Sequence, residues 1–428
     1  MNETVLDVQD KPKAGQWISL SLQHMFAMFG ATILVPQLVG LSPAIALLTS
    51  GIATLIFILI TQFKVPAYLG SSFAFIVPIT IATETGGIGS AMIGAMFVSL
   101  VYAIVSLVIW KTGYQWLMRL LPPIVVGPVI IVIGLALSGT AVDMAMNITV
   151  DGAKQYSLMH FSAALVTLLT AIICTIYFKN IISLMPVLIG IIVGYIYSAL
   201  VGIIDFAPIT AAKWIAAPDF LIPGVDYSFQ VTPTLLFVMV PIAIVTISEH
   251  IGHQLVLGKV VERNYIKDPG LHRSILGDGL GTFISSLVGG PPKTTYGENI
   301  GVLAITRVYS IYVIIGAAIF AILFSFLGKL MAVIATIPTA VLGGISILLF
   351  GIIASSGLRM LVDNNINFGD KRNLVIASVI LVIGIGGAKI EFSETFQIEG
   401  MALAAIIGVL LNLVLPGRNK NELDDGTK

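Results

Sequence analysis

Acidic and histidine side chains interrupt stretches of this chain that are otherwise apolar. Glu249, His250 and His253 fall within one such stretch, and Glu298 opens another. Glu249 and His253 are four residues apart and would share one face of a helix, whereas His250 would point about 100° away. An ionisable side chain within a membrane span costs at least about 2.5 kcal/mol, so it usually marks a transport pathway. If these stretches lie in a membrane, they are candidates for binding a polar solute and a proton.

Each of these residues also has a simpler structural reading. Glu249 and His253 would satisfy one another as a pair between helices, but we favour a functional role because Glu298 supplies a second carboxylate. For His250 and His24 we favour the structural reading, in which each ties its segment to the scaffold by a hydrogen bond. Asp278 is a third acid in an apolar segment, and we expect it to lie toward the cytoplasm and to support the site without contacting solute.

The composition places these residues in a membrane protein. The chain has 428 residues, of which 57% are hydrophobic and only 10% charged, against about 25% charged in soluble domains. Apolar runs such as 91–110 match the thickness of a bilayer. The formal net charge of zero argues against a nucleic-acid partner. The single cysteine excludes an internal disulfide. The polar first thirteen residues do not resemble a signal peptide. The sequence therefore predicts a polytopic inner-membrane protein whose first apolar span is retained.

Fourteen membrane segments can be drawn along the chain. We place them at 15–35, 42–62, 66–82, 88–110, 121–139, 160–178, 182–204, 231–257, 272–289, 293–306, 308–328, 335–354, 372–388 and 397–415. An even number puts both termini on one side of the membrane. Counted by side, 17 basic residues lie with the termini and 5 opposite, namely Lys154, Lys213, Lys293, Lys329 and Lys389. The positive-inside rule then predicts cytoplasmic termini.

Two segments carry polar, glycine and proline clusters where a plain spanning helix would be uniformly apolar. They are 66–82, which begins Pro-Ala-Tyr-Leu-Gly-Ser-Ser-Phe, and 289–306, which contains Pro-Pro-Lys-Thr-Thr-Tyr-Gly-Glu-Asn. Irregular backbone at membrane depth is tolerated only where it is buried in protein or lines a cavity. Paired interrupted segments in corresponding halves point to a transporter's binding site. We therefore expect both segments to be broken helices beside the solute.

The two halves of the chain correspond. Gln23 and Glu249 stand 226 residues apart, as do Ser72 and Glu298. We divide the chain into residues 1–206 and 207–428, with seven segments in each. Because seven is odd, the second repeat must be inverted in the membrane, which places the site near the midplane between the repeats.

The expected site combines acceptors and donors. Half-helices beginning near Phe73 and Gly297 would present free backbone N–H groups, and glycine at 297 allows close approach. Glu249 and Glu298 would accept hydrogen bonds. A planar solute with alternating N–H and C=O groups would satisfy both sets, with Phe73 and Phe350 against its faces. Two carboxylates would repel a large organic anion.

At these residues the sequence resembles the nucleobase–ascorbate transporter family, also called nucleobase–cation symporter family 2. The family's long motif reads Glu-Asn-Ile-Gly-Val-Leu-Ala-Ile-Thr-Arg at 298–307, and its Gln-His pair is Gln23-His24. Glutamate at the first motif position is similar to the uracil branch, and the runs around 21–24, 66–76 and 294–301 resemble bacterial uracil–proton symporters. The resemblance covers nearly the whole chain.

The resemblance implies a helical fold with a core domain (segments 1–4 and 8–11), a gate domain (5–7 and 12–14) and short antiparallel strands in broken segments 3 and 10. It implies uracil held by Glu249 and Glu298 and by backbone amides at Phe73 and Gly297, in a homodimer without a cofactor beyond the coupling proton. Residues implied to support this network are His253, Tyr296, Asn299, Gln23 and His24. One departure is Phe350, where the family's uracil carrier has a tyrosine.

The expected mechanism couples the solute to a proton. Uracil is neutral near pH 7, so co-moving a proton makes each cycle carry charge. Two buried carboxylates close together cannot both stay ionised cheaply, and we expect one, Glu298 before Glu249, to be protonated when the loaded site crosses, with His253 in the same network. Core would move against gate. The alternatives are a xanthine, urate or other nucleobase symporter of the same fold and a solute channel. A membrane enzyme using Glu249 and His253 would lack a metal-ligand set or nucleophile motif.

Overall fold

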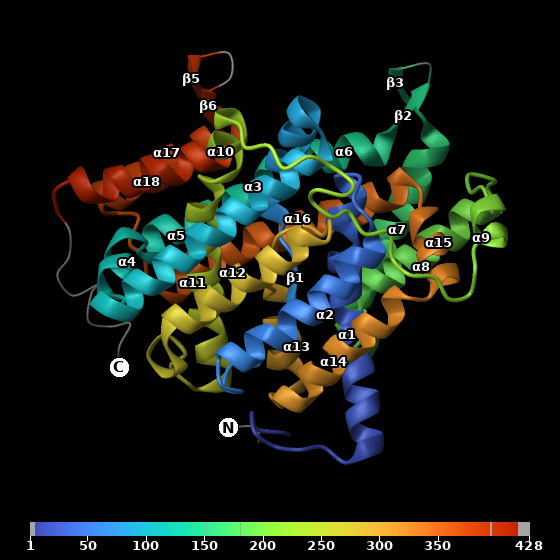
Figure 1. Ribbon diagram of the computed structural model, residues 1–428, viewed down its shortest axis with the longest axis horizontal. Helices are drawn as coiled ribbons and strands as arrows, with labels where there is room; N and C mark the ends of the chain where they lie inside the picture. The colour runs from blue at the N-terminus through green and yellow to red at the C-terminus, as the bar shows by residue number, and fades with distance from the viewer. Residues whose placement is uncertain (1–4, 151, 180, 394–395, 418–428) are drawn as a thin grey trace.

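The computed structural model describes residues 5–150, 152–179, 181–393 and 396–417. Helices make up most of the described chain (Figure 1). The helices of its first half are α1 (Ala14–Leu38), α2 (Pro43–Ile60), α3 (Ile76–Thr112), α4 (Gln115–Leu120), α5 (Pro123–Ala136), α6 (Ser138–Met146), α7 (Leu158–Tyr177), α8 (Pro186–Leu200) and α9 (Ala207–Ala211). Those of its second half are α10 (Pro233–Met239), α11 (Ile242–Val261), α12 (Leu271–Leu287), α13 (Gly297–Thr306), α14 (Ile311–Ser325), α15 (Gly328–Ala335), α16 (Thr339–Asp363), α17 (Lys371–Ile385) and α18 (Gly400–Val414). Three short helical turns are η1 (Phe73–Phe75), η2 (Ile181–Leu184) and η3 (Ile266–Gly270).

In the described chain a helix lies in each of the fourteen predicted segments, but three boundaries differ from the prediction. Segments 3 and 4 merge into α3, which is interrupted at Gly87, where the backbone φ is 77°. Segment 8 is divided into α10 and α11. Segment 14 was expected from 397, but a strand occupies that stretch and α18 begins at Gly400.

The long apolar helices support a multi-pass membrane protein. Within the described residues, seven helical spans are long and apolar enough to cross a membrane, and three shorter apolar helices accompany them. Arg418, Lys420 and Lys428, which were counted with the termini, lie outside the described residues. Lys293 was counted among the basic residues opposite the termini, but the structure does not present it as an exposed charge. It is fully buried within a strand, because its ammonium finds hydrogen-bond acceptors inside the protein.

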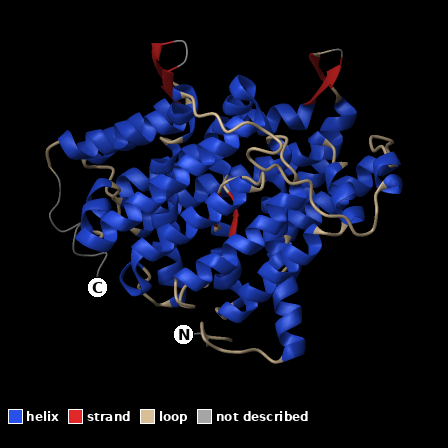
Figure 2. Cartoon of the chain, viewed as in Figure 1, coloured by secondary structure: helices blue, strands red, loops and turns tan. Residues whose placement is uncertain are grey.

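Six short strands form three antiparallel pairs in the described chain. β1 (Leu69–Ser71) pairs with β4 (Lys293–Thr295), in the register Leu69↔Thr295 and Ser71↔Lys293. The prediction of short antiparallel strands in the two broken segments is thereby confirmed. Hairpins β2 (Asn147–Val150) with β3 (Ala153–Tyr156) and β5 (Lys389–Ser393) with β6 (Phe396–Glu399) were not predicted. Figure 2 shows one strand pair amid the helices and the two hairpins, well separated from each other, projecting on the same side of the molecule.

The helices pack into two groups. The first packing group is α1, α2, α3, α12 and α14, in which α2 packs on both α12 and α14 and α12 packs on α3. The second packing group is α5, α6, α7, α8, α16, α17 and α18, in which α16 packs on α5, α6 and α7 and α17 packs on α18. Helix α11 contacts α3 on one side and α5 and α18 on another, so it lies where the two groups meet.

Candidate functional site

The β1–β4 pair sets the positions of two helix starts. Ser72 N–H donates to Pro292 O at 2.9 Å, and Tyr296 N–H donates to Tyr68 O at 3.1 Å, which extends the pairing at both ends. Turn η1, leading into α3, begins directly after β1, and α13 begins at Gly297 directly after β4. Because the strands are antiparallel, the two helices leave the β1–β4 pair, here called the strand crossing, in opposite directions. No side chain of the described chain caps η1 or α13 at its first residue, so backbone N–H groups and the positive dipole ends face the crossing.

Both candidate carboxylates are incompletely hydrogen-bonded; Glu249 is buried, and Glu298 is half-buried with its Oε1 atom enclosed. Glu249 lies in the middle of α11 and is 6% exposed. Glu298 lies in the first turn of α13, and α11 packs against α13 and η1. Among the described residues, Glu249 Oε2 and Glu298 Oε1 have no hydrogen-bond partner. Glu249 is within electrostatic range of Glu298. Buried carboxylate oxygens without donors are costly, so this pair is suited to receive donors from a solute or a proton.

His253 joins α11 to the crossing. Its Nδ1 lies 3.3 Å from Thr295 Oγ1. A Cβ placed on Gly297 would lie 3.2 Å from His253 Nε2, tighter than ordinary packing. Glycine at 297 therefore lets the start of α13 approach the imidazole. The contact with Thr295 differs from the Glu249–His253 pair considered from the sequence, and Thr295 was not anticipated.

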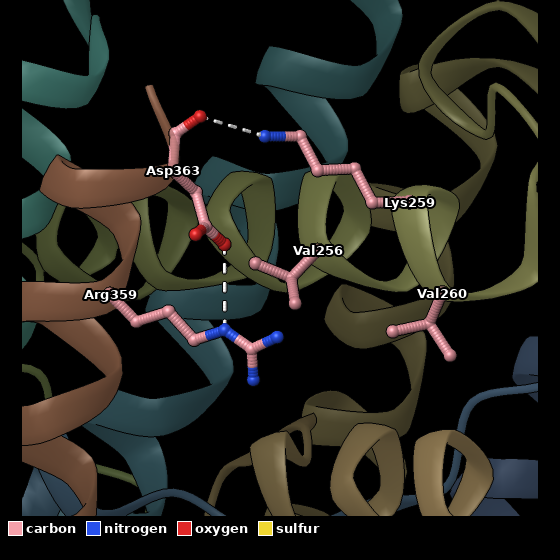
Figure 3. A pocket seen from close by; sticks show the side chains of 5 residues that line it. All are labelled: Val256, Lys259, Val260, Arg359 and Asp363. Atoms are coloured by element: carbon pink, nitrogen blue, oxygen red, sulfur yellow. Dashed lines mark hydrogen bonds and ion pairs between the residues drawn. The ribbon is translucent and has the colours of Figure 1, made fainter. Parts of the chain in front are cut away.

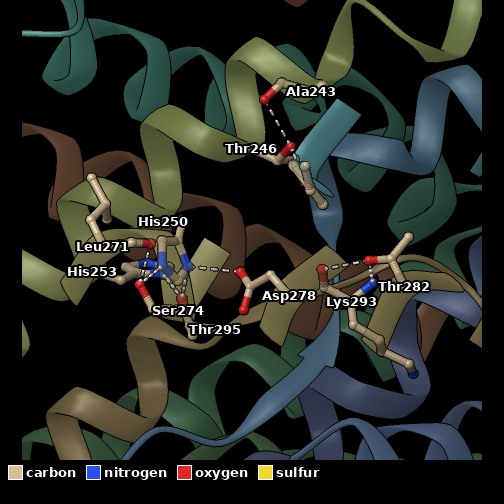
Figure 4. A network of polar contacts seen from close by, with 11 residues as sticks. Ala243, Thr246, His250, His253, Leu271, Ser274, Asp278, Thr282, Lys293 and Thr295 are labelled. Atoms are coloured by element: carbon tan, nitrogen blue, oxygen red, sulfur yellow. Dashed lines mark hydrogen bonds and ion pairs between the residues drawn. The ribbon is translucent and has the colours of Figure 1, made fainter. Parts of the chain in front are cut away.

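A second histidine anchors α11 to α12. His250 Nδ1 lies 2.8 Å from Asp278 Oδ2, and His250 Nε2 lies 2.8 Å from Ser274 Oγ (Figure 4). All three side chains are buried. This is the scaffold contact expected for His250. Asp278 is also within electrostatic range of Glu249.

Further buried contacts hold α13 and the strands in place. His24 Nε2 lies 2.6 Å from Asn299 Oδ1, and the Asn299 amide donates to Pro66 O at 3.0 Å, which joins α1, α13 and the chain before β1. Gln23 lies beside His24 in α1 and is half-buried. Tyr296 donates its hydroxyl to Ser71 O at 3.1 Å.

Two aromatic rings meet beside the strand crossing. Phe73 of η1 and Phe350 of α16 stand edge to face, with ring centroids 5.9 Å apart and planes 83° apart. Both are buried. Phe350 therefore brings the second packing group to the site, and it does so without a hydroxyl.

Two pockets flank the site along α11. One, of about 340 Å³, lies between the last turns of α11 and α16 and is lined by Val256, Lys259, Val260, Arg359 and Asp363 (Figure 3). The other, of about 250 Å³, lies near the start of α11, with Ile242 and Phe237 facing residues of α17 and α18 such as Gly384 and Met401. Neither pocket is lined by Glu249 or Glu298, and Glu249 lies between the two pockets along α11. The polar groups, and not a large cavity, define the candidate site.

Comparisons with known proteins find relatives over nearly the whole chain. The sequence model of the Permease family (Xan_ur_permease) matches residues 15–391. A uracil permease of Bacillus caldolyticus is 67% identical over 418 residues, covering 98% of this chain and 96% of the relative. Uracil permeases of Bacillus subtilis (strain 168) and Escherichia coli (strain K12) are 59% and 43% identical, covering 98% and 97% of this chain and 97% and 94% of those relatives.

Solved structures share the fold at low sequence identity. The transmembrane domain of the cyanobacterial bicarbonate transporter BicA matches with a TM-score of 0.63 at 13% identity, covering 93% of this chain and 96% of that one. Murine Slc26a9, an anion transporter, matches with a TM-score of 0.69 at 11% identity, covering 95% of this chain and 69% of that one. The family match and the relatives together show that this chain belongs to the Permease family (Xan_ur_permease), the nucleobase–ascorbate transporters, and is a multi-pass membrane transporter and not an enzyme.

Proposed function

We propose that this chain is a uracil–proton symporter that takes up uracil by alternating access. The observation that carries the proposal is a pair of carboxylates, Glu249 and Glu298, each with a buried oxygen that has no partner within the described chain, beside two helix starts whose N-cap residues make no side-chain cap. The names of the relatives, uracil permeases at 43–67% identity, support uracil as the solute.

Uracil suits these groups by its edge chemistry. Its ring N–H groups would donate to the carboxylates of Glu249 and Glu298, and its carbonyls would accept from backbone N–H groups at Phe73 and Gly297. Every polar group of the bound solute would then have a partner. A base that lacks one of these groups would leave a carboxylate or a backbone N–H group of the site unpaired, which is costly. Phe73 and Phe350 would separate from their present contact to pack against the ring faces. His253, next to Gly297, would belong to the same network.

A proton shared with the carboxylates would drive accumulation. Glu249 and Glu298 interact electrostatically and each has a buried oxygen without a donor, so closing the site with both ionised is unfavourable. We place the proton on Glu298 when the loaded site crosses, and Glu249 keeps its charge to accept from uracil. Each proton moved inward gains about 2.3 kcal/mol per 100 mV. No further cofactor enters this mechanism.

The two packing groups would supply the moving parts. The first group would act as the core and the second as the gate, and helix α11 carries Glu249 along their boundary. One pocket lies between α11 and α16 of the second group, and the other lies between α3 of the first group and α5, α17 and α18 of the second; because they lie toward opposite ends of α11, a shift of core against gate would open one and close the other. At one end Lys259 donates to Asp363 O at 3.3 Å, a contact between α11 and α16 that such a shift would break.

The membrane arrangement belongs to the same proposal. We propose fourteen crossings in two inverted repeats, residues 1–206 and 207–428, in a bacterial inner membrane with both termini in the cytoplasm. We also propose a homodimer. The antiparallel pairing of β1 with β4, one from each half, supports the repeats because it joins matching broken segments.

The test is uptake of labelled uracil by vesicles that contain the purified chain, with and without an inward proton gradient. The proposal expects saturable, uphill uptake that collapses with a protonophore. Flux that neither saturates nor runs uphill would indicate a channel. Stronger competition by unlabelled xanthine or urate than by uracil would indicate another nucleobase.

The variant Glu298→Gln tests the proton assignment. Glutamine keeps an acceptor and cannot release a proton, so the variant should exchange labelled for unlabelled uracil across the membrane but lose uphill uptake. Uphill accumulation by this variant with unchanged pH dependence would show that Glu298 is not the proton carrier.

A further inference from the structure

A lysine is fully buried beside the strand crossing. Lys293, in β4, has no exposed surface. Its ammonium donates to Ala46 O and to Ser50 Oγ of α2, both at 2.9 Å. Both acceptors are uncharged, and the ion pairs among the described residues do not include Lys293. Burying such a group without an ionic partner is costly, so a role beyond stability needs consideration.

Lys293 is held at its backbone as well as at its ammonium. Its N–H donates to Thr282 Oγ1 at 3.0 Å, and that hydroxyl donates to Lys293 O at 3.1 Å. Thr282 belongs to α12. Figure 4 shows the Lys293 side chain running on past Thr282, away from His250 and Asp278. The residue thus joins α12 and α2 through the strand between them.

The same face of α2 also holds the other strand. Ala46, Ser50 and Thr54 are spaced four residues apart and share a helix face. Thr54 Oγ1 accepts from Leu69 N–H of β1 at 2.9 Å. Helix α2 is therefore a common support, which contacts β1 directly and reaches β4 through Lys293.

Each contact with α2 lies four residues before a helix start. Leu69 precedes Phe73, and Lys293 precedes Gly297, by that spacing. The separation of the two helix starts, and with it the space between their N–H groups, depends on both strands keeping their distance from α2. Loss of the hydrogen bonds from the Lys293 side chain to α2 would allow β4 to shift against β1, and Gly297 and Glu298 would shift with it.

We propose that Lys293 is a positioning residue for transport, which holds the Gly297–Glu298 end of the site at the right distance from Phe73 without touching the solute. This inference rests on the proposed function. A role in stability alone would lower the melting temperature and the yield and leave the affinity for uracil unchanged, whereas misplacement of the helix start weakens binding by a correctly folded transporter.

The decisive variant is Lys293→Met, which keeps most of the side-chain length and removes the donors. Hydrogen bonds to charged groups are worth enough that we expect the KM for uracil uptake to rise about tenfold or more. The maximal rate of uptake per folded transporter should stay within about threefold of wild type, since the groups proposed to bind uracil and the proton are all present. Lys293→Arg, which retains a cationic donor, should recover part of the affinity.

The acceptor side supplies an independent variant. Ser50→Ala removes one of the two acceptors, and we expect the KM to rise about two- to fourfold. Its matched control is Ser325→Ala, a buried serine of α14 whose hydroxyl donates to Ile322 O of its own helix at 2.6 Å, which should leave the KM unchanged. In the double variant, Ser50→Ala should add nothing to Lys293→Met, because both remove the same contact.

The measurements are uptake by vesicles and thermal melting of each purified variant. A wild-type KM in folded Lys293→Met, or full additivity with Ser50→Ala, would overturn the proposal. If Lys293→Met does not fold, the comparison of Ser50→Ala with Ser325→Ala decides, and equal KM values would overturn it. Failure of the wild-type chain to transport uracil would instead refute the proposed function.

Discussion

The central strand pair and the two hairpins use the same secondary structure in opposite surroundings. β1 and β4 are three residues each, fully buried, and come from opposite halves of the chain. β2 and β3 are adjacent in sequence, β3 is exposed throughout, and the hairpins project on the same side of the molecule (Figure 2). Any two-stranded pair is marginal by itself, but the strands of the central pair have no short connection to hold them together, so that pair depends more on the helices around it than the hairpins do.

The difference lies in how the strand edges are satisfied. Exposed strand edges can hydrogen-bond to water, whereas buried edges need partners in the protein. In the central pair those partners are side chains of α2 and α12. Thr54 of α2 accepts from Leu69 N–H, and Thr282 of α12 accepts from Lys293 N–H. Every substitution there acts on the helix starts that follow the strands. Equivalent substitutions in the hairpins should act only locally, and matched pairs of variants test that contrast.

The largest contrast is expected between two glutamates. Glu249→Ala removes a buried acceptor that no neighbouring group replaces, and we expect saturable uracil uptake to fall at least about 100-fold in vesicles. Glu391→Ala removes an exposed carboxylate of β5 that pairs with Lys389, and uptake should not change. Normal uptake by folded Glu249→Ala would break the comparison.

Two glycines give the next largest contrast. A Cβ on Gly70 of β1 would overlap the Tyr296 ring, so Gly70→Ala must push that ring or the strands apart, at a cost of about 1–3 kcal/mol. We expect a lower melting temperature and uptake below about a tenth of wild type.

The hairpin counterpart is Gly152→Ala, between β2 and β3. Nothing lies within 4 Å of the added Cβ, but φ is +78°, so the backbone is strained by about 1–2 kcal/mol. Uptake should stay at the wild-type level. A transport defect in Gly152→Ala as large as that in Gly70→Ala would show that the hairpin belongs to the transport machinery.

A smaller contrast is expected between two aromatic pairs. Phe350→Ala removes the edge-to-face partner of Phe73. From the free energy of an aromatic pair of this kind, we expect its loss to raise the KM for uracil about three- to tenfold. Phe350→Tyr keeps the ring and should stay within about threefold of wild type.

The control is Tyr156→Ala in β3, whose ring centroid lies 6.2 Å from that of Phe161. It should leave the KM unchanged, because Tyr156 is exposed and remote from the strand crossing. A KM in Phe350→Ala equal to that in Tyr156→Ala would remove Phe350 from the proposed site.

The smallest effect is expected in an ion pair at the β2–β3 hairpin. The hydrogen bond from Lys154, followed by that from Asn147, holds the pKa of Asp143 below its ordinary value. A lowered pKa in the folded state contributes stability that is present above the unfolded pKa and is lost as the pH falls through the folded pKa. Because the pair is solvent-screened, Asp143→Asn should cost at most about 0.5 kcal/mol at pH 7.

Melting curves at neutral and acidic pH check this prediction. Wild type should lose slightly more stability on acidification than Asp143→Asn, and uptake should be equal in the two proteins. A large loss of stability at neutral pH would mean that the hairpin is coupled to the packed helices.

The sequence alone was sufficient for the helical membrane fold, because apolar runs of bilayer length allow few other structures. It also located both broken segments, since clusters of glycine, proline and polar residues are uncommon in plain spanning helices. The hairpins were missed because four-residue strands at the end of apolar helices leave no period to detect. The start of α18 was misplaced for the same reason.

Which residues meet was a matter for the tertiary structure. The sequence analysis counted Lys293 with the basic residues opposite the termini, because a lysine within a polar cluster normally stays in water. The fold buries it instead, since α2 offers two oxygens that lie far away in the chain. Glu249 and His253 were expected on one helix face, but only the packing of α11 on β4 gave His253 a partner in Thr295. Chain spacing determines what lies along one helix, whereas contacts across helices depend on how separate segments pack.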